Sequence, residues 1–377
     1  MKLQRWFIDF LRHEKASGII LIACTFFSLL IANSSIGESW IKIFHLQLFQ
    51  FSLLEIINDG LMTLFFLLIG LELKREFIDG KLSHIKFAIL PVAAAFGGMI
   101  MPAFIYYALN KGTATQSGAG IPMATDIAFS LGILSLLGNR IPLSLKLFLT
   151  SLAIIDDLGA IITIAAFYSQ HISLVYLSVA IIIWLLLLLA NKYNFSNSIL
   201  YIIGGILMWY CMLQSGIHPT FSGVLLAFAI PFKSIKNKSL AENFYHQLDK
   251  PVAFFIVPLF ALANTSILIP SHFSEHLISA NAIGIFLGLV IGKPFGITLF
   301  TYLAQKIKIG KLPDDINIKM IAGVGMLGGI GFTMSIFISL LAFDIRQVQE
   351  ISKLAVIISS ISATIIGWGW FTLVVRK

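Results

Sequence analysis

The sequence predicts an all-α, polytopic membrane protein that crosses a membrane about twelve times. Hydrophobic residues make up 58% of the 377 residues and charged residues only 12%, about half the charged fraction of a soluble domain. The apolar residues gather in runs long enough to cross a bilayer core as helices. The expected spans, one to twelve, cover residues 16–33, 53–73, 87–109, 120–138, 143–168, 174–191, 197–213, 216–232, 251–269, 281–304, 319–343 and 353–374.

Basic residues are unevenly distributed among the loops between these spans. With twelve spans both termini lie on one side, and most of the 26 lysine and arginine residues fall on that side. The positive-inside rule therefore places both termini in the cytoplasm. Because topology accounts for the net charge of +8, no nucleic-acid partner is expected. Cys24 and Cys211 lie in apolar runs, so neither a disulfide nor a metal site is expected.

Two adjacent carboxylates, Asp156 and Asp157, lie near the middle of span five. At the bilayer midplane each carboxylate costs roughly 2.5–3.5 kcal/mol on insertion scales. The plainer interpretation is a polar pair that packs helices, or a misplaced span whose acids reach an interface. Because intramembrane carboxylates usually serve a function, the pair is predicted to belong to a functional site.

Lys293 lies near the middle of span ten, in an otherwise apolar run. An ammonium at that depth needs an acidic partner, or must be neutral. Asp126, Asp156 and Asp157 are the candidate partners. From the residues alone, all three stay open.

Glycine and proline interrupt two further spans. In span four, the glycines and proline of residues 118–122 stand just before Thr125 and Asp126. In span eleven, five glycines lie within residues 323–331, more than one helix-packing face needs. Both patterns predict a helix that breaks within the membrane, so that its freed backbone lines a cavity.

Spans three to five and spans ten to twelve share one design. Each triplet has a glycine-interrupted middle span and a charged residue at mid-membrane in an outer span. The triplets start seven spans apart, an odd number, so they cross the membrane in opposite directions. This pattern is typical of inverted repeats, in which two broken helices cross at the binding site.

Two other regions leave alternatives open. Glu72 and Glu76 lie four residues apart on one face of the end of span two. They fit a solvated helix end and an acidic entrance that concentrates cations equally well. In the outer loop, partial alternation of apolar and polar residues at 43–51 indicates a short strand or an interfacial segment, and a plain surface loop accounts for it equally well.

Seven stretches of the chain, taken in order on the twelve-span plan, resemble the NhaA-type sodium/proton antiporters of bacteria. The stretches are Ile57-Asn58-Asp59-Gly60, Gly70 to Glu76, Ala124 to Phe129, Leu152 to Ile161, Pro258 to Asn264, Gly292-Lys293-Pro294 and Gly328 to Ser335. The resemblance covers essentially the full length, and this combination of motifs is specific.

The resemblance implies a role for each central residue. Asp157 corresponds to the main cation-binding carboxylate, and Asp156 to an assisting carboxylate that pairs with Lys293. Thr125 and Asp126 correspond to the broken-helix positions beside the site, where Asp126 compensates the helix ends that meet at the crossing. Sodium, lithium and protons are the implied transported ions, and no cofactor is implied.

The resemblance also implies regulation by pH. Glu72 and Glu76 map onto the cytoplasmic entry funnel, and His246 and Asp249 onto a cluster at the start of span nine. Two departures are visible there: Tyr245 stands where the family has Glu, and Asp249 where it has a second His. The outer loop is shorter than the family's hairpin-bearing loop and lacks an Asn-Gly or Gly-Gly turn, so a homodimer formed through it stays an open expectation.

The sequence thus predicts an electrogenic, pH-regulated sodium/proton antiporter of the bacterial inner membrane. The expected organisation is a single domain of residues 1–377, with a core bundle at about 87–168 and 281–374 and an interface region at about 1–86 and 174–269. The mechanism expected is competition between sodium and protons for buried carboxylates.

Three alternatives to exchange fit part of the pattern. The closest is a sodium- or proton-coupled symporter of an organic solute, which would want solute anchors beyond an acid pair and a lysine. A prenyltransferase would need a third acid after Asp156 and Asp157, but positions 160 and 161 are Ala and Ile. An aspartyl protease could use Asp126 with Asp157, which leaves Lys293 without a role.

Overall fold

The computed structural model describes residues 2–80, 83, 85–168, 172–232, 239–269 and 277–374. The chain forms two compact units. Unit 1 holds Met1–Asn33, His84–Ala160 and Ile267–Lys377, and unit 2 holds Ser34–Ser83 and Ile161–Ser266. Each unit is therefore built from segments that are distant in the sequence.

Unit 1 contains both predicted triplets. Its elements are α1 (Lys2–Ala32), α5 (Ile85–Asn110), the 3₁₀ helix η3 (Gln116–Met123), α6 (Ile127–Leu136), η4 (Gly138–Arg140), α7 (Leu143–Phe167, up to Ala160), α14 (Ala280–Leu287), the π helix η6 (Gly288–Gly292), α15 (Lys293–Lys306), α16 (Ile318–Gly328), α17 (Phe332–Ala342) and α18 (Arg346–Val374).

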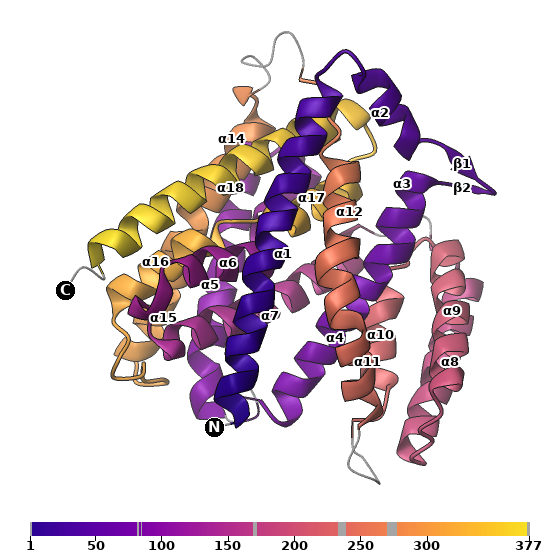
Figure 1. Ribbon diagram of the computed structural model, residues 1–377, viewed down its shortest axis with the longest axis horizontal. Coiled ribbons are helices and arrows are strands. Elements are labelled where there is room, and N and C mark those ends of the chain that lie inside the picture. The colour runs from indigo at the N-terminus through magenta and orange to yellow at the C-terminus, as the bar shows by residue number, and fades with distance from the viewer. Residues whose placement is uncertain are drawn as a thin grey trace. The chain divides into compact units, whose positions relative to one another are not determined.

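Unit 2 is built around the second predicted span. Its elements are α2 (Gly37–Phe44), β1 (Gln47–Leu48), β2 (Phe51–Ser52), α3 (Leu53–Glu55), the π helix η1 (Ile56–Leu61), α4 (Met62–Ile78), α8 (Leu174–Lys192), α9 (Ser198–Ser215), α10 (Phe221–Ala229), α11 (Leu240–Pro251), the π helix η5 (Val252–Ile256) and α12 (Val257–Asn264). Within this unit α8 and α9 run side by side (Figure 1).

The predicted fold class is confirmed, because every one of the twelve expected spans contains helix. Among the described residues eight helices are long and apolar enough to cross a membrane, and nine if the bent pair α16 and α17 counts as one span. Helices α10 and α12 are too short to pass this length test, with nine and eight residues. Helix length alone therefore gives fewer spans among the described residues than the twelve expected from the apolar runs and the loop charges.

The two triplets of unit 1 meet where α5 packs on α15. A Cβ on Gly97 would overlap the carbonyl oxygen of Gly296, and a Cβ on Gly296 would overlap the carbonyl oxygen of Gly97. This reciprocal contact requires glycine on both helices, and it brings the two backbones together as small residues do in membrane helix pairs. The contact lies one turn from Lys293, so it helps to place that residue.

In unit 2 the helices α4 and α10 pack closely, and Lys74 secures the end of α10. The Lys74 ammonium donates hydrogen bonds to the carbonyl oxygens of Ala227, Phe228 and Ile230, at 3.3, 2.7 and 2.5 Å. The last carbonyls of a helix lack partners within it, and a cation there also offsets the helix dipole. Lys74 is therefore a cap for α10.

The outer loop contains a two-stranded antiparallel hairpin, so the strand alternative is the correct one. Gln47 pairs with Ser52 and Leu48 with Phe51. The turn needs neither Asn-Gly nor Gly-Gly, because Phe49 itself adopts a positive φ of 61°. That conformation is uncommon for a bulky side chain, and Phe49 is fully exposed.

Candidate functional site

Both predicted breaks are present, and they meet in the interior of unit 1. The first break lies between η3 and α6, at Thr125 and Asp126, and the second lies between α16 and α17, which are bent by 50°. The Asp126 amide donates to the carbonyl oxygen of Ile330 at 2.7 Å. The Thr125 hydroxyl donates to the carbonyl oxygen of Gly328 at 3.0 Å. The two interrupted helices therefore satisfy part of each other's freed backbone.

Asp126 caps two helices at once. Its Oδ1 accepts the Phe129 amide of α6 at 3.0 Å. Its Oδ2 accepts the Thr333 amide and hydroxyl of α17, at 3.1 and 2.6 Å. The N-termini of both helices carry partial positive charge, and a carboxylate satisfies their orphan amides. One buried acid thus compensates the two helix starts that face each other at the crossing.

Lys293 pairs with Asp156, the partner that the resemblance implied and that the residues alone left open among three acids. Lys293 Nζ lies 3.0 Å from Asp156 Oδ2, and both side chains are fully buried. The ammonium also donates to the carbonyl oxygen of Met123, at the end of η3. The same carboxylate oxygen accepts the Thr125 hydroxyl at 2.8 Å. The ion pair is therefore joined directly to the first break.

Asp157 is buried beside this pair, with 1% of its surface exposed. It is close enough to Lys293 to interact with it electrostatically. Among the described residues no donor reaches Asp156 Oδ1. Thr125, Asp126, Asp156, Asp157 and Lys293 thus gather at one place, as predicted. The donor set of carboxylate, hydroxyl and backbone carbonyl oxygens suits a hard cation.

A second group of predicted residues lies in unit 2, on α4 and α11. Glu72 interacts electrostatically with Arg75, Glu76 and Asp249. The Arg75 guanidinium lies 4.5 Å from the centre of the Tyr245 ring, a distance typical of a cation–π contact.

Tyr245 occupies the position at which a Glu was expected, and it is buried. Burial raises the pKa of its phenol well above its usual range, so the side chain is neutral at physiological pH. His246 is exposed on the surface and touches the edge of the Tyr245 ring. The structure therefore brings Glu72, Glu76 and Asp249 together, whereas His246 joins them only through Tyr245.

The chain matches the family model described as Na+/H+ antiporter 1 over residues 8–371. The chain belongs to this family. It is similar to the sodium/proton antiporter NhaA of Flavobacterium psychrophilum, with 58% identity over 98% of this chain and 96% of that protein. The NhaA protein of Cytophaga hutchinsonii is 54% identical over 100% and 97% of the two chains, and that of Dechloromonas aromatica 51% identical over 98% and 96%. The resemblance found from the motifs is thus confirmed.

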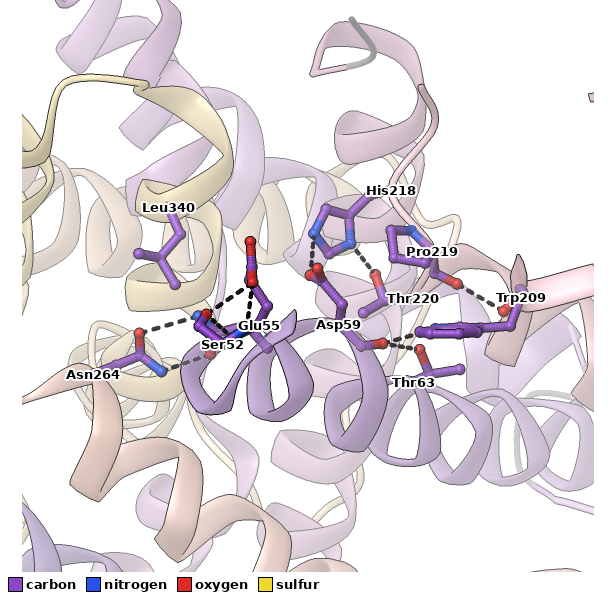
Figure 2. A network of polar contacts seen from close by, with 12 residues as sticks. Ser52, Glu55, Asp59, Thr63, Trp209, His218, Pro219, Thr220, Asn264 and Leu340 are labelled. Atoms are coloured by element: carbon purple, nitrogen blue, oxygen red, sulfur yellow. Dashed lines mark hydrogen bonds and ion pairs between the residues drawn. The ribbon is translucent and has the colours of Figure 1, made fainter. Parts of the chain in front are cut away.

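One polar network of this antiporter-family chain was not singled out from the sequence. His218 Nε2 lies 3.3 Å from Asp59 Oδ1, and His218 Nδ1 lies 2.7 Å from the Thr220 hydroxyl oxygen. The Trp209 indole donates to the Asp59 carbonyl oxygen at 2.9 Å. Figure 2 shows Asp59 held between these groups of unit 2. The signal was the Ile57-Asn58-Asp59-Gly60 motif, but a motif does not tell which distant residues meet it.

Proposed function

We propose that the chain exchanges sodium for protons across the bacterial inner membrane, at the carboxylates Asp156 and Asp157. The observation that carries the proposal is the buried acid pair with a single ammonium, at the crossing of two broken helices. Ion sites of inverted-repeat transporters are formed by such interrupted helices near the bilayer midplane. Family membership and the names of the relatives support exchange, and they give no support to solute symport.

Exchange follows from competition for the same oxygens. Sodium is a hard cation that takes carboxylate, hydroxyl, carbonyl and water oxygens as ligands. A protonated carboxyl is a much poorer ligand, so the site holds either protons or a cation. Protons displace sodium on the more acidic outer side, and sodium displaces protons on the inner side. Alternating access between the two sides then carries each load across.

The two acids have different roles in this proposal. Asp156 is engaged by the Lys293 ammonium and by the Thr125 hydroxyl. A cation at Asp156 must compete with that ammonium, so Asp157 is the primary cation ligand and Asp156 the proton-linked partner. Unit 1 holds all of these residues and is the ion-binding unit.

Further properties are part of the same proposal. Exchange of more than one proton for each sodium makes transport electrogenic, and lithium, another hard cation, is accepted as well. Regulation by cytoplasmic pH is assigned to the group formed by Glu72, Glu76 and Asp249, in which Glu72 interacts electrostatically with the other two acids. His246, next to Tyr245, belongs to the same regulatory region.

The test is sodium-dependent proton movement in everted membrane vesicles, measured over a range of pH. Asp157→Asn keeps the size of the side chain and removes its charge, so exchange should fall to background. Asp314→Asn is the matched control, because Asp314 is exposed and its ion pair in the described part of the chain is with Lys311, three residues away. Exchange by the Asp157→Asn variant at the rate of the control would refute the assignment of the site.

A further inference from the structure

The helix that carries Lys293 contains a wide turn immediately before that residue. Residues Gly288–Gly292 form a π helix, and the Lys293 amide donates to the carbonyl oxygen of Gly288, five residues back. A π turn holds one more residue than the regular α helix around it, and such turns recur at functional sites. Each residue of an α helix turns the chain by about 100°, so this surplus residue changes the direction in which Lys293 points.

On one side the wide turn is seated against two prolines. A Cβ on Gly288 would lie 2.7 Å from Pro122 Cβ, in η3 just before the first break. A Cβ on Gly292 would lie 3.0 Å from Pro102 Cα, on α5. Real Cβ atoms are rarely found so close, so only glycine allows the turn to approach both prolines.

On its other side the wide turn touches the second break. A Cβ on Gly329 would overlap the carbonyl oxygen of Leu289, and one on Gly331 would lie 3.1 Å from Leu289 Cδ2. Leu289 is fully buried. The wide turn is therefore held between the two breaks, and Lys293 follows it directly in the chain.

The corresponding helix of the first triplet lacks this feature. Helix α5 runs as an α helix from Ile85 to Asn110 and has no charged residue at the contact with α15. Within unit 1, the π turn therefore lies in the triplet helix that carries the buried ammonium and not in its counterpart.

We propose that Gly288 and Gly292 are positioning residues for ion exchange, because they seat the wide turn so that the Lys293 ammonium reaches Asp156. The inference rests on the proposed role of Asp156 and Asp157. When the turn is displaced, the ammonium moves away from Asp156. A buried carboxylate without its counter-charge takes up a proton, and a protonated carboxyl is a poor sodium ligand.

The experiment measures exchange in proteoliposomes over a range of sodium concentrations. Gly288→Ala and Gly292→Ala should each raise the apparent KM for sodium roughly tenfold, with a smaller change in maximal rate, as expected when reacting groups are misplaced. The matched control is Gly60→Ala, which adds a methyl group to the π helix η1 of unit 2, where nothing lies within 4 Å of the added atom. It should keep the wild-type KM.

A second variant loosens the same seat without adding atoms. Pro122→Ala keeps the Cβ but removes the ring Cγ, which would lie 3.0 Å from a Cβ on Gly288. This variant should raise the KM for sodium several-fold, and it tests the inference when Gly288→Ala or Gly292→Ala fails to fold. A wild-type KM in the folded alanine variants, or a lower maximal rate at unchanged KM, would overturn the inference.

These results separate the two proposals. In one outcome the wild-type protein exchanges sodium, Asp157→Asn does not, and Gly288→Ala, Gly292→Ala and Pro122→Ala all keep the KM of Gly60→Ala. In that case only the positioning role fails. If Asp157→Asn exchanges normally, the site itself is wrong, whatever the glycine variants do.

Discussion

The two triplets of unit 1 each contain a helix that breaks within the unit, but they contribute different charged side chains to the crossing of the two breaks. At the crossing, the first triplet contributes three acids, Asp126, Asp156 and Asp157, and the second contributes the Lys293 ammonium. The second triplet also contributes hydroxyl groups there: Thr333 donates to Asp126, and Ser360 Oγ accepts the Phe332 amide at 3.2 Å. The buried acids at the crossing therefore come from one triplet, and the buried ammonium that pairs with Asp156 comes from the other.

This division fits the proposed exchange of two ions at one site. In that proposal, acids from the first triplet bind the cation or the proton, and the ammonium from the second stabilises the charged form of Asp156. If each triplet contained both a carboxylate and an ammonium, each could form its own ion pair, and the proposed site would no longer need the transported ion to balance its charge. The predictions below test this division, beginning with the largest expected effect.

Removal of the ammonium should have the largest effect on stability. Lys293→Met leaves the Asp156 carboxylate buried without its counter-charge, and breaking a buried ion pair in this way costs about 3–5 kcal/mol. Thermal unfolding of the purified protein in detergent measures the loss, with Lys311→Met on the exposed surface as the control. The double variant Lys293→Met with Asp156→Asn should recover most of the lost stability. Equal stability of Lys293→Met and the control Lys311→Met would contradict the pairing.

Removal of Asp126, the cap shared by α6 and α17, should have the second largest effect on stability. Asp126→Ala deprives the starts of α6 and α17 of their acceptor, and losing a helix cap costs roughly 0.5–2 kcal/mol for each helix. The same unfolding assay should therefore show a loss of about 1–4 kcal/mol. Asp314→Ala, whose side chain is exposed, controls for the loss of an acid. Stability equal to that control would mean that Asp126 does not serve both halves.

Several features of this site could be predicted from the sequence, because they depend on the composition of short stretches of the chain. The depth of Asp156, Asp157 and Lys293 follows from the apolar runs around them, and both breaks follow from clustered glycine and proline. Composition alone could not choose Asp156 as the partner of Lys293, since three acids lay at suitable depth, and only the resemblance to a family pointed to that pair. Spacing along the chain does not give distances between helices.

Other features depend on contacts between residues that are far apart in sequence. Asp126 caps α17 through Thr333, which is 207 residues away, and no local sequence pattern predicts that contact. The wide turn at Gly288–Gly292 is a surplus of one residue inside an apolar helix, and an apolar run shows no change of period there. The hairpin turn at Phe49 uses a residue that rarely adopts a positive φ, so turn composition pointed away from it.

A smaller effect is expected when the second triplet loses its hydroxyl to Asp126. Thr333→Val keeps the shape of the side chain and removes the 2.6 Å hydrogen bond, which should cost about 1.5–3 kcal/mol because the acceptor is a carboxylate. Thr372→Val is a suitable control, since the exposed Thr372 hydroxyl bonds only within its own helix. Similar unfolding temperatures for the two variants would show that the Thr333 amide alone holds α17 to Asp126.

The smallest effect is expected at Ser360, the neutral acceptor that α18 offers to the start of α17. Ser360→Ala leaves the buried Phe332 amide without its acceptor, and a neutral hydrogen bond of this kind contributes about 0.5–1.5 kcal/mol. Ser362→Ala, two residues along the same helix, removes a hydroxyl that bonds only to Ile358 within that helix, so its loss should be smaller. A Ser360→Ala loss as large as that of Asp126→Ala would mean that the second triplet has a strong cap of its own, and the proposed dependence of one half on the acids of the other would fail.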